Sequence, residues 1–262
     1  MKRPLLRSVS AAIDGDDAAG ASQAVRAQLR LRELILGGAL KAGERIAELA
    51  MVERLAMSRT PIRTALVRLQ EEGLLETLPS GGFMVRDFSE ADIRDAIELR
   101  GTLEGLAARL AAERGVAASV LVDMRDCLAR IDDVLAAPRL TEASFSRYVA
   151  QNARFHALLG EMSGSALVQR QVDRVATLPF ASPNAFVMAH SSGPQARDRL
   201  VIAHAQHHAV VEAIVQREGA RAQALMQEHA RSAQQNLAAV LQSHRALQRL
   251  PGASLIRPAS KR

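Results

Sequence analysis

The stretch "SRTPIRTALVRLQEEGLL", residues 58–75, decides the fold because it predicts one short helix with two chemically different sides. Ser58 or Thr60 can cap this helix, since both side chains can accept a hydrogen bond from the first free backbone N–H groups. Pro61 is tolerated in the first turn, where backbone N–H groups have no intrahelical partner. The helix is expected to end at Gly73, a residue that commonly follows a helix C-terminus.

The apolar side of this helix carries residues at positions i, i+4 and i+7, which predicts contact with a core: Ile62, Leu66 and Leu69. Arg59 and Arg63 lie one turn apart on another side, and no carboxylate occurs between Arg59 and Gln70. A helix N-terminus already favours anions, so arginines there gain nothing from their own helix. We therefore expect an external anion as their partner.

The segments around this helix predict a winged helix-turn-helix over residues 22–87. A helical apolar pattern begins at Ser22 and stops at two glycines, 37–38, and a second short helix is expected over residues 48–55. The stretch "LLETLPSGGFMVRDF", residues 74–88, has two short apolar runs around a Pro-Ser-Gly-Gly turn and predicts a β-hairpin. Three helices followed by a hairpin is the order of this DNA-binding fold.

In such a fold the residues at the start of the third helix reach the floor of the major groove, and arginine can bond guanine edges through two hydrogen bonds. The glycine-tipped hairpin is expected to approach the phosphate backbone or the adjacent minor groove. An isolated run of arginines is usually only a solvated basic face, but the flanking helices and hairpin favour DNA recognition here. The predicted DNA-binding residues are Ser58, Arg59, Thr60, Arg63, Gly81 and Gly82.

Composition supports a helical protein with a polyanionic partner. Apolar residues make up 48% of the 262 residues and aromatic residues only 3%, while the net charge is +6 and the pI about 10.5. Cys127 is the single cysteine, which excludes intramolecular disulfides and cysteine-rich zinc modules. Together with Met124 at helical spacing it is expected in a core. The absence of an 18-residue apolar run predicts a soluble, cytoplasmic protein without a membrane partner.

After Ser89, a candidate N-cap followed by acidic residues, the pattern is helical almost throughout. An antiparallel all-helical bundle is therefore expected over residues 89–248, which makes the protein mainly α. Residues 1–21 and 249–262 lack periodicity and are expected to be a flexible arm and a flexible tail. Helix breaks are expected near Gly115, Pro138, Ser163–Gly164, Pro179–Pro183, Gly193–Pro194 and Arg217–Gly219.

The stretch "RIAELAMVERLAMSRTPIRTALVRLQEEGLLETLPSGGFMV", residues 45–85, resembles the DNA-binding domain of the GntR family of bacterial transcription regulators. Ala56 is a departure, because the family usually has glycine at this turn. Alanine is accommodated there if the turn avoids positive φ. Three later stretches resemble the FCD effector domain of the FadR subfamily: "ADIRDAIELRGTLEGLAARLAAERG" (91–115), "NARFHALLGEMSGSALV" (152–168) and "HHAVVEAIVQREGARAQALMQEH" (207–229).

This resemblance implies a divalent metal site, because many FCD domains bind a metal through one Asp or Asn and three His. The matching positions are Asn152, His156, His207 and His229. Imidazole ligands suit Zn²⁺ or Ni²⁺, and an oxygen ligand extends the choice to Mn²⁺. An amide oxygen contributes no charge, so Asn152 is the weaker ligand. Two alternatives remain open: the three histidines are ordinary hydrogen-bonded side chains, or His204, on the same face as His207, substitutes or joins.

Arg100 and Glu104 are four residues apart, so the pair can be a helical ion pair that contributes only a few tenths of a kcal/mol. The resemblance favours a second interpretation, because many effectors of this subfamily are organic acids. In that interpretation Arg100 points into the bundle and binds the carboxylate of a small organic acid, for which the guanidinium fork is well suited.

These features predict a ligand-responsive, homodimeric transcription regulator, a repressor that binds a palindromic operator on double-stranded DNA. One alternative is a regulator for which the metal itself is the signal. Another is a metal-dependent hydrolase with an accessory DNA-binding domain. A hydrolytic site needs a general base beside the metal, and no HExxH-like glutamate accompanies these histidines, which favours a protein that is not an enzyme.

Overall fold

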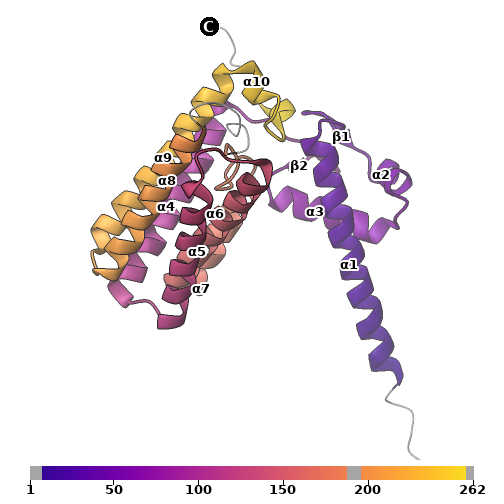
Figure 1. Ribbon diagram of the computed structural model, residues 1–262. Coiled ribbons are helices and arrows are strands. Elements are labelled where there is room, and N and C mark those ends of the chain that lie inside the picture. The colour runs from indigo at the N-terminus through magenta and orange to yellow at the C-terminus, as the bar shows by residue number, and fades with distance from the viewer. Residues whose placement is uncertain (1–7, 188–195, 258–262) are drawn as a thin grey trace, which may run out of the picture. The chain divides into compact units, whose positions relative to one another are not determined.

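The computed structural model describes residues 8–187 and 196–257 and divides the chain into two compact units. Unit 1 contains the chain up to Phe88 together with the segment that begins at Ser254, and unit 2 runs from Ser89 to Ala253. The chain therefore passes between the units twice. The elements that precede unit 2 are α1 (Ser8–Leu36), β1 (Arg45–Ile46), α2 (Glu48–Leu55), α3 (Arg59–Glu71), β2 (Leu75–Thr77) and β3 (Phe83–Val85), labelled where there is room in Figure 1.

Unit 1 is a winged helix-turn-helix, as predicted. Its three strands form one antiparallel sheet in the order β1-β3-β2, with Glu76 opposite Met84. Helices α1 and α3 pack against each other. Leu31 and Ile35 of α1 are fully buried, whereas Val25 and Leu29 of the same helix are exposed. The stripe predicted on α3 is confirmed, because Ile62, Leu66 and Leu69 are all fully buried.

The turn between α2 and α3 differs from the sequence expectation. Ala56 has φ 50° and ψ 44°, which is the left-handed region. There the N–H groups of Ala56 and Met57 bond back to the carbonyls of Glu53 and Val52, each at 3.3 Å, and end α2. A left-handed conformation brings Cβ close to the following carbonyl and costs a non-glycine residue roughly 1–2 kcal/mol. The condition under which alanine is accommodated without cost, a turn that avoids positive φ, is therefore not met, and Ala56 is strained.

Both ends of the described chain carry secondary structure that the sequence did not predict. Helix α1 begins at Ser8, so residues 8–21 are helical, whereas a flexible arm was expected over residues 1–21. Near the other end, the 3₁₀ turn η2 (Ala253–Leu255) precedes a short parallel pairing of Phe88 with Ile256. The Phe88 N–H donates to the Leu255 carbonyl at 2.8 Å, and Leu255 is fully buried.

The tail predicted over residues 249–262 is therefore wrong for residues 249–257. The physical reason is that Leu250 and Leu255 supply apolar surface for a short segment to bury, and both are nearly inaccessible to solvent. Residues 1–7 of the predicted arm and 258–262 of the predicted tail lie outside the described part of the chain.

Unit 2 is an antiparallel helical bundle, in agreement with the prediction of an all-helical domain. Ser89 caps its first helix through a capping box, because its Oγ accepts from the Asp92 N–H at 3.1 Å while its own N–H donates to the Asp92 carboxylate at 2.7 Å. The predicted break at Gly193–Pro194 lies outside the described residues. The helices are α4 (Glu90–Arg114), α5 (Ala118–Ala136), α6 (Glu142–Met162), α7 (Ala166–Ala176), α8 (Ala196–Val215), α9 (Gly219–Gln242) and α10 (His244–Leu247).

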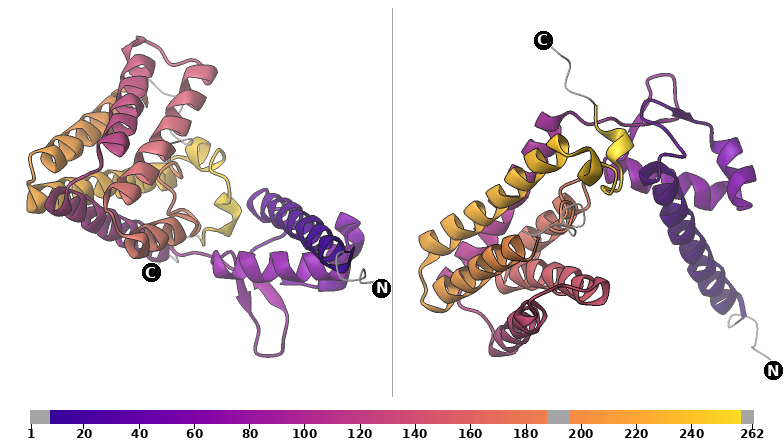
Figure 2. Two further views of the ribbon diagram at one scale, coloured as in Figure 1. Left: turned by 90° about the horizontal axis from the view of Figure 1, so that it is seen from below. Right: turned by 45° about the horizontal axis from the view of Figure 1, so that its top comes forward.

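Helices α4 and α9 run side by side through unit 2 at close range (Figure 2). Gly101 makes this approach possible, because a Cβ added there would lie 2.4 Å from the Cβ of Ala230. A Cβ added at Gly105, one turn later, would lie 3.1 Å from Gln227 Cγ and 3.2 Å from the Gln223 carbonyl oxygen, a tight but lesser contact. Small residues let two helix backbones approach, so this pairing brings the polar side chains of α4 near those of α9.

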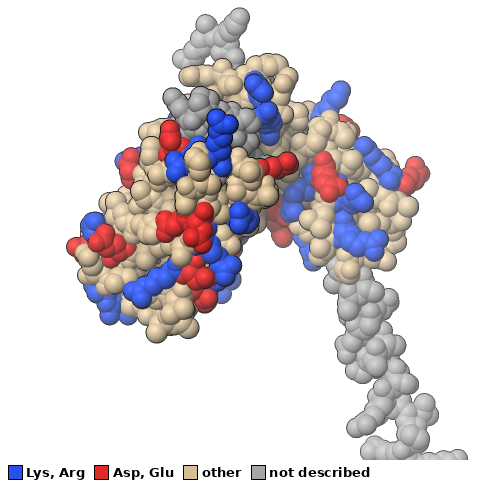
Figure 3. All heavy atoms as spheres, in the orientation of Figure 1, with Lys and Arg blue, Asp and Glu red and all other residues tan. Residues whose placement is uncertain are grey.

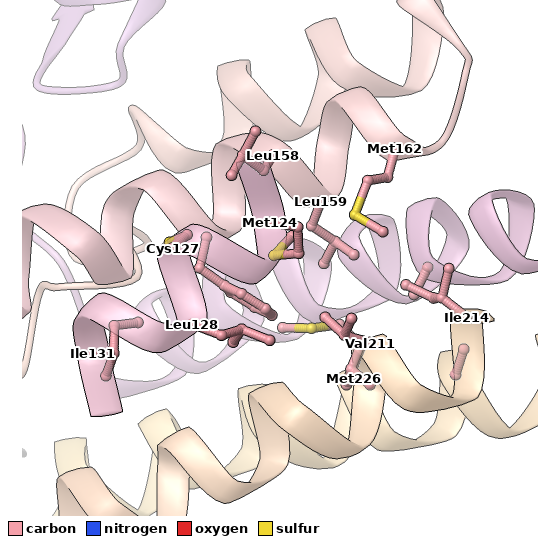
Figure 4. Close-up of a cluster of buried hydrophobic side chains, with 14 of the residues drawn as sticks. Met124, Cys127, Leu128, Ile131, Leu158, Leu159, Met162, Val211, Ile214 and Met226 are labelled. Atoms are coloured by element: carbon pink, nitrogen blue, oxygen red, sulfur yellow. The ribbon is translucent and has the colours of Figure 1, made fainter. Parts of the chain in front are cut away.

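The apolar core of unit 2 lies among α4, α5, α6, α8 and α9 (Figure 4). Met124 and Cys127 are both fully buried in it, which confirms that the single cysteine belongs to the core. Burial raises the pKa of the Cys127 thiol, so the unreactive thiol form is favoured. Within the described residues, no helix combines the length and hydropathy that are needed to cross a bilayer.

Candidate functional site

The start of α3 presents polar side chains to solvent. Ser58, Arg59, Thr60 and Arg63 are all exposed. Ser58 occupies the N-cap position, but its hydroxyl accepts no capping hydrogen bond and is free for another partner. An open depression of about 560 Å³ follows this side of the helix and is lined by Glu48, Arg59, Thr60, Arg63, Thr64, Val67, Arg68 and Glu71.

Arg59 already has an acidic partner, which the sequence analysis missed. Its Nε atom donates to Glu48 Oε1 on α2 at 2.5 Å, and the Arg59 side chain remains 68% exposed. Arg59 is therefore paired even though α3 has no carboxylate near it, because the partner comes from α2. On the face of unit 1 that Figure 3 shows, basic and acidic side chains are interspersed. An exposed pair of this kind contributes little free energy, so an external anion can displace Glu48.

The hairpin between β2 and β3 forms the wing. Gly81 and Gly82 are exposed and have φ values of 84° and 88°. A Cβ at Gly81 would meet no atom within 4 Å, so backbone conformation rather than crowding favours glycine there. Arg45 on β1 donates from Nη2 to the Gly81 carbonyl at 3.0 Å. Arg45 is an exposed cation beside the wing that sequence reasoning missed, because only the pairing of β1 with β3 brings it there.

Three histidines converge inside unit 2, as the resemblance implied. His156 on α6, His207 on α8 and His229 on α9 each offer a ring nitrogen within 4.8 Å of the others. The Nε2 atoms of His207 and His229 lie 3.2 Å apart. We call these three residues the inner cluster.

Outer hydrogen bonds orient two of these rings. His156 Nδ1 lies 2.8 Å from Glu104 Oε1, and His229 Nδ1 lies 3.0 Å from Gln206 Oε1. His156 Nε2 is buried and has no hydrogen-bond partner. A histidine that is held through one nitrogen and has the other free and buried is the usual arrangement of a metal ligand, so the inner cluster fits a divalent ion.

The protonation states of the cluster suit metal binding as well. Burial, with the neighbouring charges of His156 and Arg100, lowers the pKa of His229 to about 3. Burial also lowers the pKa of His207 well below its ordinary value. Both rings are therefore neutral at physiological pH, and neutral imidazole is the form that ligates metals.

Glu104 supplies a negatively charged carboxylate beside the inner cluster. Burial favours its protonated form, but the opposing charges of Arg100 and His156 outweigh burial and hold the pKa of Glu104 at about 2. Sequence reasoning considered Glu104 only as a helical partner of Arg100. Its contact with His156 joins α4 to α6 and could not be recognised from spacing along one helix.

Asn152 lies four residues before His156 on α6 and is buried. Its Nδ2 donates to Asn184 Oδ1 at 2.8 Å, and Asn184 in turn donates to the Val149 carbonyl at 2.9 Å. The amide nitrogen of Asn152 is thus engaged in a hydrogen bond to Asn184, which leaves its Oδ1 atom as the group that can bind a metal or a ligand. Asn152 and His229 also line the same cavity.

This cavity, with a volume of about 50 Å³, lies in unit 2. Arg100 lines this cavity and is 2% exposed. One of its guanidinium nitrogens donates to Glu104 Oε2 at 2.7 Å. Its Nε atom is buried without a hydrogen-bond partner. Arg100 therefore forms the predicted pair with Glu104 and also lines the cavity, while its binding of an effector carboxylate stays a prediction. Tyr148 lines the cavity too, and burial raises its pKa, so its hydroxyl stays protonated.

His204, considered above as an additional ligand, belongs to a second group of side chains. Its Nε2 lies 3.0 Å from Asp132 Oδ1, whereas its Nδ1 lies 3.4 Å from His207 Nδ1. His204 is therefore turned with one nitrogen towards α5 and is not one of the three converging histidines.

A winged helix-turn-helix joined to a helical bundle with a cavity is the arrangement of a ligand-binding transcription regulator. Comparison with known protein families agrees. The bacterial regulatory proteins of the gntR family match residues 23–85, and the FCD domain matches residues 95–232. The chain belongs to the GntR family of transcription regulators and carries a C-terminal FCD domain.

Individual relatives are regulators as well. The chain is 35% identical over 147 residues to an uncharacterized HTH-type transcriptional regulator in the TAR-I ttuE-ttuC' intergenic region of Agrobacterium vitis, covering 55% of this chain and 83% of that protein. It is 26% identical over 223 residues to the Glc operon transcriptional activator of Escherichia coli, covering 79% of this chain and 85% of the other. The protein is a transcription regulator and not an enzyme, so the hydrolase alternative is not favoured.

Among solved structures, the E. coli McbR/YncC structure has the same fold, with a TM-score of 0.57 and 19% sequence identity over 84% of this chain and 97% of that one.

Proposed function

We propose that the protein is a homodimeric repressor that binds a palindromic operator in the cytoplasm and changes its operator affinity when a small organic acid binds in unit 2. The observation that carries this proposal is the cavity that is lined by Arg100 and Asn152 together with His229 of the inner cluster. Repression follows from occupancy alone, because a dimer that covers promoter DNA blocks the polymerase.

DNA contact is assigned to the start of α3 and to the wing. Arg59 and Arg63 provide guanidinium groups for base edges, and Ser58 and Thr60 provide hydroxyls for phosphates. Gly81 and Gly82 let the wing backbone approach the duplex without side-chain bulk. Exposure of all these residues supports the assignment. Two copies of α3 match two half-sites only in a dimer, which is why we propose a homodimer.

The metal ligands are His156, His207 and His229, with Asn152 as a weaker oxygen ligand. The free buried Nε2 of His156 supports this assignment, since a buried polar atom without a partner is costly unless something binds it. Zn²⁺, Ni²⁺ and Mn²⁺ are the candidate ions. Such an ion supplies a fixed positive charge at the end of the cavity. Glu104 holds His156 in position, and Gln206 does the same for His229.

The effector is proposed to be a small carboxylic acid. Its carboxylate is expected to bond Arg100, whose Nε has no other partner, and to extend towards Asn152 and His229. A volume of about 50 Å³ accommodates a group of only about three to five water-sized atoms, at roughly 10–15 Å³ for each. The site therefore favours acids of a few heavy atoms over long-chain acids.

Metal sensing is the second candidate, because the inner cluster can bind a metal whether or not an acid is present. Operator binding by three samples separates metal sensing from acid sensing. The first sample is metal-stripped protein, the second is Zn²⁺-loaded protein, and the third is Zn²⁺-loaded protein with a small hydroxy acid. An acid effector alters operator affinity only in the third sample relative to the second. A metal effector alters it between the first and the second.

The matched variants are a His156→Ala, His207→Ala double variant and His244→Ala, an exposed histidine on α10. Only the double variant should lose the response, while His244→Ala should behave as the wild type. If the double variant folds, binds DNA and still responds to the acid, the anchoring role of the metal is wrong. Coupling of about 1–3 kcal/mol is typical, which is roughly 5- to 150-fold in operator affinity.

A further inference from the structure

A second group of metal-binding side chains lies outside the inner cluster. His204 and His208 are one turn apart on α8, and Asp132 comes from α5. Each of the three offers one nitrogen or oxygen atom, and these atoms all lie within 4.8 Å of one another. We call these residues the outer cluster.

The three donor atoms of the outer cluster form a nearly equilateral triangle. Asp132 Oδ1 lies 3.0 Å from His204 Nε2 and 3.2 Å from His208 Nε2, and the two nitrogens are 3.2 Å apart. In a tetrahedral zinc site with bonds of about 2.0–2.1 Å, neighbouring ligand atoms are separated by about 3.3 Å. The three atoms are therefore already spaced as one face of such a tetrahedron.

Hydrogen bonding alone does not explain why the rings of His204 and His208 approach each other and Asp132 so closely. Both Nε2 atoms point at the same carboxylate oxygen and at each other. Two N–H groups aimed at one acceptor place their protons close together, whereas two lone pairs and one carboxylate oxygen around a cation do not conflict. Deprotonated imidazole nitrogens and a carboxylate are a common donor set for zinc.

The surroundings prepare His204 for this role. His204 is buried, with only 4% of its surface exposed, so the packing around its ring restricts its orientation. The side chains of Asp132 and His208 are 54% and 47% exposed, so an ion can reach the cluster from solvent.

We propose that Asp132, His204 and His208 form a second binding site for a divalent transition metal such as Zn²⁺, separate from the inner cluster and open to solvent. Three protein ligands leave one coordination position for water or an external ligand. The bound ion cross-links α5 to α8. The site uses none of the three inner histidines as ligands, although His204 Nδ1 lies 3.4 Å from His207 Nδ1.

The test is a Zn²⁺ titration of metal-stripped, full-length protein by calorimetry. The samples are the wild type, Asp132→Ala, His208→Ala and the control His244→Ala. Wild type and His244→Ala should bind one more equivalent of Zn²⁺ than Asp132→Ala and His208→Ala, or bind that equivalent at least tenfold more tightly. The mutated side chains are half-exposed, so both variants should keep the circular dichroism of the wild type.

The same titration in a His229→Ala background separates the outer cluster from the inner one. The outer site should still bind Zn²⁺ in that background and should lose it on the further change His208→Ala. Tetrahedral absorption by Co²⁺ in place of Zn²⁺ should follow the same pattern. Equal Zn²⁺ stoichiometry and affinity in wild type, Asp132→Ala and His208→Ala would overturn the proposal, whatever the inner cluster does.

Discussion

Glu104 binds His156 across two helices, with Oε1 lying 2.8 Å from the Nδ1 atom of the ring. The other oxygen of the same carboxylate accepts from Arg100 at 2.7 Å. The buried carboxylate of Glu104 thus orients both a candidate metal ligand, His156, and the residue proposed to bind the effector, Arg100. Its removal is therefore expected to weaken both metal binding and effector binding.

A Glu104→Gln substitution should therefore weaken metal binding at the inner cluster. The amide has nearly the same shape but no charge, and loss of an outer-shell carboxylate typically costs 10- to 100-fold in metal affinity, so we expect about that decrease. Competition with a chromophoric chelator measures it. Glu113→Gln, on the exposed side of α4, is the control. Unchanged affinity in Glu104→Gln would mean that Glu104 does not support a metal site.

Arg59→Ala and Arg63→Ala should each weaken specific operator binding by about 1–3 kcal/mol, the range for a lost base contact. Fluorescence anisotropy with specific and scrambled DNA at one salt concentration separates specific from non-specific affinity. Arg231→Ala on α9 is a suitable control, because its side chain is 62% exposed, close to the 68% of Arg59. If both α3 variants keep full affinity and discrimination, the assigned docking face is wrong.

Ala56→Gly should stabilise unit 1. Relief of the left-handed strain is worth roughly 1–2 kcal/mol, and the greater freedom of glycine in the unfolded chain offsets about 0.4–1 kcal/mol of this. Hydrogen exchange over α2 and α3 measures the net gain. Ala137→Gly, where φ is −66°, should instead destabilise its own unit. Faster exchange in Ala56→Gly than in the wild type would contradict the strain at this turn.

Gly101→Ala should destabilise unit 2 by about 1–3 kcal/mol, because the new methyl group would overlap Ala230 on the neighbouring helix. Gly160→Ala on α6 is the matched control. A Cβ there would lie 3.5 Å from Gln169, an ordinary contact, so the gain in helix propensity should stabilise by about 0.5–1 kcal/mol. Thermal unfolding followed by circular dichroism compares the two. Equal melting temperatures for both variants would argue against the close packing of α4 on α9.

Metal-stripped protein should lose stability as the pH falls below 6.5. The pKa of His229 is about 3 in the folded state and near 6.5 when unfolded, so between these values the unfolded chain binds more protons and acid favours unfolding. Glu104, with a pKa of about 2 against 4.5, adds the same trend at lower pH. Melting temperatures from about pH 8 to pH 5 test this. A His229→Gln variant should show a shallower decline, and a stability that rises towards acid pH would contradict the expectation.

The local features of the fold were predictable from the sequence, because they depend on neighbours along the chain. The buried stripe of Ile62, Leu66 and Leu69, the cap at Ser89 and the glycine-tipped hairpin all follow from short-range spacing. Burial of Leu255 beside Phe88 was missed, because it pairs segments far apart in the chain and shows no periodicity.

The candidate site, too, was predictable only where its residues could be recognised from the sequence itself. The resemblance identified the three histidines that converge, yet the groups that orient or neutralise them come from other helices. Glu104 reaches His156 from α4, Glu48 reaches Arg59 from α2, and Asp132 reaches His204 from α5. Such contacts depend on packing between elements, which spacing within one helix does not specify. The left-handed turn at Ala56 was missed for a different reason, since its side chain favours the opposite conformation.

The return of the C-terminal segment to Phe88 has a consequence for biosynthesis. Unit 1 is discontinuous, since its last piece begins at Ser254, after all of unit 2 has been translated. At about 5–20 residues per second, the ribosome needs roughly 10–30 s to cover the intervening chain. During that interval the partner of the Phe88 N–H, the Leu255 carbonyl, does not yet exist. The DNA-binding head of a nascent chain is therefore incomplete until the effector domain has been made, so an unfinished polypeptide lacks the finished head that could occupy the operator.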